Sequence, residues 1–135
     1  MLIEFIRYCQ KEKLFKPDDK ILLAVSGGVD SVVMCELFYR AKFKFGIAHC
    51  NFKLRDKESD EDEKFVRDLA DKYKAKFYLK TFETKKYAVS NGISIQMAAR
   101  ELRYKWFEEL LKSENYKYIA TAHHSDDQIE TFFIN

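Results

Sequence analysis

Short apolar segments alternate with amphipathic segments along almost the whole chain, and this alternation limits the fold more than any other feature of the sequence. Apolar runs with the length of a buried strand are expected at residues 20–25, 43–49, 76–82 and 116–122. Apolar residues at helical spacing predict helices over the first dozen residues, 30–41, about 59–73, 83–91, about 94–114, and from 125 onward. Because parallel neighbours need crossover helices, this order predicts an α/β fold with a doubly wound, mostly parallel sheet.

The size and composition of the chain fit one soluble domain. With 135 residues, 47% of them hydrophobic, and only one Pro and four Gly, it can bury a core and is too apolar for a disordered chain. Its longest unbroken apolar run covers residues 21–25, far short of the ~20 residues of a membrane span. The first residues lack the basic-then-apolar order of a signal peptide, and the three cysteines show no metal-binding spacing. We therefore expect a cytoplasmic protein without membrane contact.

Charge alone does not identify a partner for this chain. The net charge is +2, which is too balanced to indicate a nucleic-acid surface by itself. Acidic residues concentrate at 56–63, where Ser59 and Asp62 have the spacing of a helix cap. We interpret this run as the charged start of a helix.

The sharpest local feature is Ser-Gly-Gly-Val-Asp-Ser at residues 26–31, between the first expected strand and the helix after it. The two glycines permit positive φ and a close approach of the backbone to a ligand. The amides of residues 28–31 would open a helix N-terminus that suits an anion, and the hydroxyls of Ser26 and Ser31 can donate to phosphate oxygens. Asp30 would repel a phosphate unless a cation lies between them, which points to Mg²⁺. An ordinary turn, with Asp30 or Ser31 as the helix cap, remains open on these residues alone.

In string and in context, this segment resembles the PP-loop of the N-type ATP pyrophosphatases, which split ATP between its α and β phosphates and adenylate a carbonyl oxygen. Three further segments resemble the tRNA(Ile)-lysidine synthetase family: His-Cys-Asn-Phe-Lys-Leu-Arg at 49–55, Ala-Ala-Arg-Glu-Leu-Arg-Tyr at 98–104, and Ala-Thr-Ala-His-His-Ser-Asp-Asp-Gln-Ile-Glu-Thr at 120–131. The resemblance covers nearly the whole chain but only the front part of that enzyme. One departure is that the family more often has His where Phe52 stands.

The resemblance implies a fold, a reaction and partners. The fold would be the adenine nucleotide alpha hydrolase-like α/β fold, with residues 1–135 forming an N-terminal PP-loop ATP-binding domain and the tRNA-recognition domains absent. The reaction would use ATP and Mg²⁺ to join free L-lysine to the wobble cytidine of tRNA(Ile), and a homodimer is compatible with it. Residues 131–135 continue an apolar helical pattern without a stop signal, so we expect the domain to be incomplete at its C-terminus. Such a fragment is expected to be inactive on tRNA by itself.

The same resemblance implies roles for individual residues. The nucleotide would contact Ala24, Ser26, Gly27, Gly28, Val29, Asp30, Ser31, His49 and Asn51. The residues expected in catalysis are Asp30, Arg100, Arg103, His123 and Asp127. The expected Mg²⁺ ligands are Asp30, Asp126 and Asp127, which supply the oxygen atoms that this ion prefers.

Alternative interpretations stay open for most of these residues. A lone His at a strand end often bonds to a loop, Arg100 and Arg103 could form a solvated stripe, and two adjacent Asp residues could cap a helix. The aromatic residues at periodic positions, such as Phe38, Phe65 and Trp106, are expected in the core. Two other functions are a tRNA thiolation enzyme of the PP-loop type, which commonly depends on cysteines that this chain does not place in a C-x-x-C pair, and a nucleotide-binding module without chemistry.

Overall fold

The computed structural model describes residues 18–122 and 129–132. Helices and strands alternate within this part of the chain in the order β1 (Lys20–Ala24), α2 (Val29–Arg40), β2 (Lys44–Asn51), α3 (Asp56–Tyr73), β3 (Lys76–Thr81), α4 (Thr84–Asn91), α5 (Ile95–Ser113), β4 (Tyr118–Ala122) and β5 (Ile129–Phe132). The predicted α/β class and the predicted strands and helices between residues 20 and 122 are confirmed. The helix predicted for the first dozen residues lies outside the described residues.

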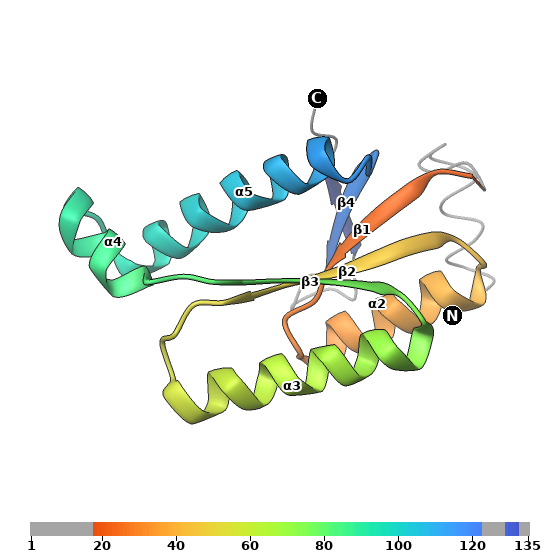
Figure 1. Cartoon of the computed structure of the whole chain (residues 1–135), viewed down its shortest axis with the longest axis horizontal. Helices are drawn as coiled ribbons and strands as arrows, with labels where there is room; N and C mark the ends of the chain where they lie inside the picture. Colours follow the sequence, from red (N-terminus) through yellow and green to blue (C-terminus); the bar gives the residue numbers. More distant parts are fainter. Residues whose placement is uncertain (1–17, 123–128, 133–135) are drawn as a thin grey trace.

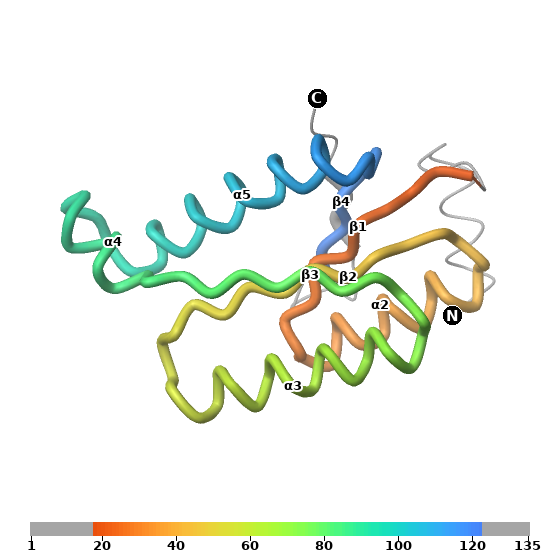
Figure 2. The backbone as a smooth tube through the Cα atoms, viewed as in Figure 1, coloured from red at the N-terminus to blue at the C-terminus, as the bar shows by residue number. Residues whose placement is uncertain are grey.

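One sheet with the strand order β3-β2-β1-β4-β5 forms the centre of the molecule, and β1, β2, β3 and β4 run parallel. Helices α2 and α3 cover one face of this sheet, and α5 covers the other (Figure 1; the backbone path alone is shown in Figure 2). The chain leaves β1 toward β2 on one side, whereas it returns from β3 to β4 on the other side of β1. In such a sheet the loops diverge at the carboxyl ends of β1 and β4, and ligands bind in the resulting crevice.

Two apolar cores, one on each face, hold the helices to the sheet. Ile21 and Leu23 face α2 and α3, whereas Leu22 between them faces α5, and all three side chains are fully buried. A strand covered on both faces therefore appears as an unbroken apolar run in the sequence. Phe38 and Trp106 lie in the cores as predicted, but the prediction for Phe65 is wrong, because its side chain is 46% exposed.

The predicted start of α3 is one turn too late. The helix begins at Asp56 after Arg55, so Ser59 lies within its first turns and is not its cap. The Ser59 hydroxyl instead accepts a hydrogen bond of 3.2 Å from the Arg55 amide, ahead of the helix. The spacing of Ser59 and Asp62 is that of a capping box, but the Ser59 oxygen accepts from the Arg55 amide, four residues before it, and not from an amide that follows it.

The helix predicted from residue 125 onward is wrong for residues 129–132. These residues form β5, which pairs antiparallel with β4 in the register Ile119↔Phe132 to Ala122↔Ile129. The four residues of β5, Ile-Glu-Thr-Phe, are too few for their spacing to distinguish a strand from a helix, and the edge of β4 offers backbone groups for pairing.

None of the helices in the described part of the chain combines the length and the apolar character that crossing a lipid bilayer requires.

Candidate active site

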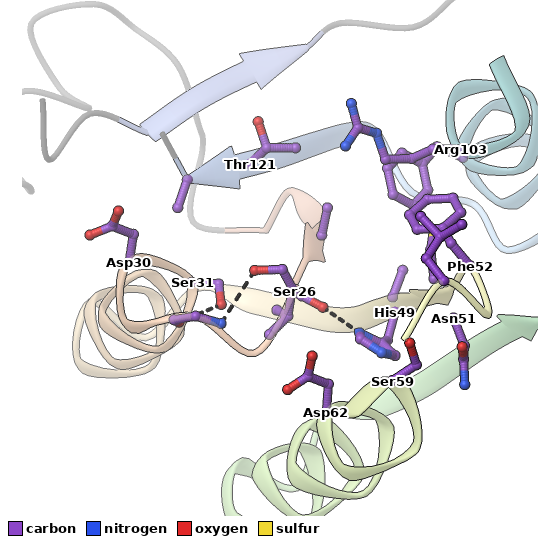
Figure 3. Close-up of a pocket in the computed structure, with 18 of the residues that line it drawn as sticks. Ser26, Asp30, Ser31, His49, Asn51, Phe52, Ser59, Asp62, Arg103 and Thr121 are labelled. Carbon is purple, nitrogen blue, oxygen red and sulfur yellow. Dashed lines mark hydrogen bonds between the residues drawn. The ribbon is translucent and has the colours of Figure 1, made fainter. Parts of the chain in front are cut away.

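A cavity of about 490 Å³ lies at the carboxyl ends of β1, β2 and β4, at the predicted crevice (Figure 3). Its volume is in the range of small-molecule sites. Of the residues predicted for the site, the cavity is lined by Ala24, Ser26, Gly28, Asp30, Ser31, His49, Asn51 and Arg103. The whole lining comes from the ends of β1, β2 and β4, from the loops after β1 and β2, and from helices α2, α3 and α5.

The loop between β1 and α2 is held in shape by its own serines. The Ser31 hydroxyl accepts a hydrogen bond of 3.2 Å from the Gly27 amide and donates one of 2.8 Å to the Gly28 carbonyl oxygen. The Ser26 hydroxyl accepts one of 3.3 Å from the Gly28 amide. Because Ser31 is only 4% exposed, its hydroxyl fixes the loop more than it offers a donor to a ligand. The Ser31 amide donates a hydrogen bond of 3.1 Å to the Gly28 carbonyl oxygen, so of the amides predicted to face an anion, those of Gly28 and Ser31 have partners within the protein. The dipole at the N-terminus of α2 still favours an anion there.

Gly27 is the residue of the loop whose backbone requires glycine. Its φ is +101°, and a Cβ atom there would lie 3.6 Å from Oδ1 of Asp62, whereas Gly28 has an ordinary φ of −73°. We expect Gly27→Ala to lower the free energy of unfolding by about 1–3 kcal/mol through backbone strain. The matched control, Gly28→Ala, carries no positive φ and should cost less, at most about 1 kcal/mol for replacing a glycine at the N-cap of α2. Urea unfolding of both variants measures the difference, and equal stability of the two would contradict the strain at Gly27.

His49 is hydrogen-bonded to the residue at which the loop between β1 and α2 begins. The buried His49 ring donates a hydrogen bond of 2.8 Å from Nδ1 to the carbonyl oxygen of Val25, and the Val25 amide donates one of 2.9 Å to Ala48. These bonds join the ends of β1 and β2 where the loop begins. His49 also lines the cavity, so its bond to Val25 does not remove it from the candidate site, and its role toward a nucleotide stays a prediction.

Asn51 positions the start of α3 beside the cavity. Its side-chain amide donates to Asp60 at 3.3 Å and to Glu63 at 3.1 Å, and its carbonyl oxygen accepts from the Lys53 amide at 3.0 Å. With 2% exposure, Asn51 ties the end of β2 to α3 from within. Asn51 lines the cavity, but its polar side-chain atoms bond to the protein, and its predicted contact with a nucleotide stays a prediction.

The acidic run at the start of α3 contributes to the site, which the sequence interpretation missed. Asp62 and Ser59 line the cavity, and Figure 3 draws Asp62 below the loop that holds Ser26. Phe52, Phe107 and Thr121 were also missed and also line it. The one available signal was the position of the acidic run directly after the second strand, which brings it to the same edge of the sheet.

Of the two arginines of α5, Arg103 faces the site and Arg100 does not line it. Arg103 is half-buried in the cavity wall, whereas Arg100 is exposed; each guanidinium carbon lies 5.1 Å from the centre of the Tyr104 ring. Figure 1 shows that α4 and the first turns of α5 extend beyond the sheet. One helical turn of about 5 Å toward that end is enough to carry Arg100 away from the cavity.

Cys50 lines the cavity but is not poised to react. Burial raises the pKa of its thiol to about 12, although the charge of Arg103 acts in the opposite direction. Burial likewise raises the pKa of Cys35 to about 12. A raised pKa keeps a thiol protonated at neutral pH, and the thiolate is the reactive form. Both described cysteines therefore behave as apolar side chains.

The remaining predicted residues contribute less or cannot be placed. Val29 is 78% exposed and does not line the cavity. His123, Asp126 and Asp127 lie outside the described residues, and with them two of the three expected Mg²⁺ ligands. Within residues 18–122 and 129–132, no three His, Cys, Asp or Glu residues are grouped so that they could hold a metal ion. Asp30, the third expected ligand, lines the cavity and carries a carboxylate beside the loop.

A comparison with known protein families shows to which family this chain belongs. A family model described as the PP-loop domain matches residues 3–135. The chain belongs to this PP-loop family. The match includes the segment at 26–31, and membership in the family implies that the domain binds ATP.

Several curated relatives of this PP-loop chain carry one name. The tRNA(Ile)-lysidine synthase of Bacteroides thetaiotaomicron is 50% identical over 130 residues, which cover 96% of this chain and 30% of that protein. The protein of the same name from Chlorobaculum tepidum is 41% identical over 136 residues, covering 98% of this chain and 41% of that protein. The chain thus spans about a third of the length of these relatives.

Solved structures confirm the fold at low sequence identity. An NH3-dependent NAD synthetase from Campylobacter jejuni matches with a TM-score of 0.66 and 16% identity, covering 93% of this chain and 55% of that one. An NMN synthetase from Francisella tularensis matches with a TM-score of 0.63 and 14% identity, covering 87% and 50%. The PP-loop chain shares its architecture with both.

Proposed function

We propose that residues 1–135 form the N-terminal ATP-binding part of a tRNA(Ile)-lysidine synthase. The whole protein would join the ε-amine of free lysine to C2 of the wobble cytidine of tRNA(Ile). The observation that carries this proposal is the 50% identity to a tRNA(Ile)-lysidine synthase across a chain whose loop, His49, Asn51 and Arg103 meet at one cavity. Localisation in the cytoplasm, where tRNA is modified, is part of the same proposal.

Two walls of the cavity offer positive charge to the phosphates of an ATP molecule. The triphosphate would lie against the amides at the start of α2, where the helix dipole favours anions. Arg103 enters from the opposite wall and can hold a phosphate oxygen or the charge that develops at the α-phosphate. Asp30, with Asp126 and Asp127 from the segment after β4, would hold Mg²⁺. The ion would neutralise pyrophosphate as it leaves.

The proposed reaction has two displacements. The C2 carbonyl oxygen of cytidine attacks the α-phosphorus, and the bond from that phosphorus to the bridging oxygen breaks as pyrophosphate leaves. The lysine ε-amine then attacks C2, loses a proton, and displaces AMP, which departs with the former carbonyl oxygen. The protein mainly positions the partners and stabilises charge in such steps. Arg103 is the predicted catalytic residue that lines the cavity wall and could stabilise this charge.

Thiolation of tRNA is the less favoured function for this site. Cys50 is the described cysteine that lines the cavity, and its pKa of about 12 keeps it protonated. A sulfur-transfer mechanism that uses a cysteine thiolate needs the opposite shift.

A chimeric enzyme tests the proposed function in a complete context. The matching 130 residues of the Bacteroides thetaiotaomicron protein are replaced by this chain, and transfer of labelled lysine to a tRNA(Ile) transcript is measured. We expect ATP-dependent transfer by the chimera and none by the chimera with Asp30→Ala. A folded chimera that binds ATP but transfers no lysine would contradict the proposal.

A further inference from the structure

A row of aromatic rings leads from the cavity into the core on the α5 side. Phe52 lines the cavity and stacks on Phe82, with ring centres 5.5 Å apart and planes 20° apart. Phe82 meets Trp106 edge-to-face at 6.2 Å, and Trp106 contacts Phe107 at 5.7 Å. Because Phe82, Trp106 and Phe107 are at most 8% exposed, the half-buried Phe52 ring is supported from behind by a packed layer.

The backbone fixes the position of this ring. The Phe82 amide donates a hydrogen bond of 2.8 Å to the Asn51 carbonyl oxygen, which holds the residues after β3 beside the end of β2. Phe52 directly follows Asn51, whose side chain is bonded to Asp60 and Glu63. A ring held in one place loses little entropy when a flat ligand stacks on it.

The wall around Phe52 combines apolar surface with positive charge. Phe107 and Leu54 line the cavity with it, and so do Arg103 and Arg55, of which Arg55 is ion-paired with Glu58 at 3.5 Å. Figure 3 shows Phe52 and Arg103 together on the side of the cavity away from Asp30 and Ser31. One end of the cavity therefore suits phosphate, and the other suits a planar, uncharged ring beside a phosphate or sugar.

We propose that Phe52 is the platform on which a nucleobase stacks in this cavity. The inference rests on the proposed function, which places two nucleobases at this site: the adenine of ATP and the target base of the RNA. Both offer the same π-face to Phe52, so the stacking chemistry is shared and the experiment distinguishes the two sources. Phe52 would select a ligand with a base over one that carries phosphate alone.

Calorimetry on the full chain tests the adenine source. The dissociation constants of ATP and inorganic tripolyphosphate are measured with Mg²⁺, and their ratio gives the preference for the base. We expect Phe52→Ala and Phe52→Leu to lower this preference about tenfold or more, as removal of a base–aromatic stack does, and Phe52→Trp to retain it. Phe65→Ala, an aromatic residue that does not line the cavity, is the matched control and should leave the preference unchanged. Circular dichroism confirms that each variant is folded.

A second arm tests the RNA source. A stem-loop RNA with a cytidine at the wobble position is compared with the same RNA carrying an abasic site there. A loss of preference in Phe52→Ala and Phe52→Leu in either arm supports the platform and identifies its base. Preferences that survive both substitutions in both arms would overturn it, as would a wild-type chain without preference in either arm. Failure of the wild-type chain to bind both ATP and tripolyphosphate would instead count against the proposed function.

Discussion

Arg103→Ala is expected to weaken binding of ATP·Mg²⁺ to this chain by about 10- to 100-fold. Arg103 is the arginine of α5 that lines the cavity, and it lies across from the loop of Ser26 and Gly28. A hydrogen bond between ionised groups contributes about 1.5–3 kcal/mol, and each 1.4 kcal/mol changes the dissociation constant tenfold. Titration calorimetry at fixed salt measures the change.

Arg100→Ala provides a matched control on the same helix. It removes the same guanidinium group one turn away, at an exposed position that does not line the cavity, and it leaves Tyr104 with its other arginine. We expect less than about a twofold change in the dissociation constant, as for a solvated surface charge. If the two substitutions weakened binding equally, the assignment of Arg103 to the cavity wall as the functional arginine would be wrong.

Gly46→Ala is expected to be the most destabilising small substitution in the sheet. A Cβ atom at this buried position of β2 would lie 2.1 Å from the hydroxyl oxygen of Tyr116 and 2.9 Å from its Cζ. Tyr116 is only 6% exposed, and its hydroxyl is hydrogen-bonded to that of Tyr78 at 3.1 Å. The ring must shift, so overpacking and a broken hydrogen bond should together cost about 2–4 kcal/mol.

Thermal unfolding followed by circular dichroism measures this effect. For a chain of this size the expected loss corresponds to a fall in Tm on the order of 10 °C. Tyr116→Phe removes the nearest clashing atom, so Gly46→Ala combined with Tyr116→Phe should regain part of the lost stability. A Gly46→Ala chain as stable as the wild type would show that the Tyr116 ring is not held where the structure places it.

The order of strands and helices between residues 20 and 122 was predictable because each element has a recognisable pattern of apolar residues: an unbroken run for a buried strand, or helical spacing for a helix. Ile21, Leu22 and Leu23 form a continuous apolar run because both faces of β1 are covered. The two glycines after it signalled the loop. The segment at 129–132 has no such pattern. It is a strand because it pairs with the edge of β4, and this pairing cannot be predicted from the residues of the segment alone.

Site residues at the ends of strands were predictable from the sequence. The prediction failed for residues whose position depends on how a helix packs against the sheet. The sequence indicated that Asp62 belongs to a solvated acidic run. In the structure, the Asn51 side-chain amide donates hydrogen bonds to Asp60 and Glu63, and these bonds hold the start of α3, with Asp62, beside the end of β2. Arg100 and Arg103 share a helix face in the sequence, and only the position of α5 over the sheet separates them. Both outcomes require contacts between residues distant in the chain.

Whether the cavity beside the loop after β1 binds ATP is measured by comparing binding of ATP·Mg²⁺ to this chain and to its Asp30→Ala variant. Titration calorimetry is run on both proteins after circular dichroism has confirmed that they are folded. We expect the wild-type chain to bind ATP and the variant, without the cavity-lining carboxylate of Asp30, to lose most of this affinity. A folded wild-type chain that does not bind ATP would contradict this expectation, because the loop after β1 would then be a turn and not a phosphate site.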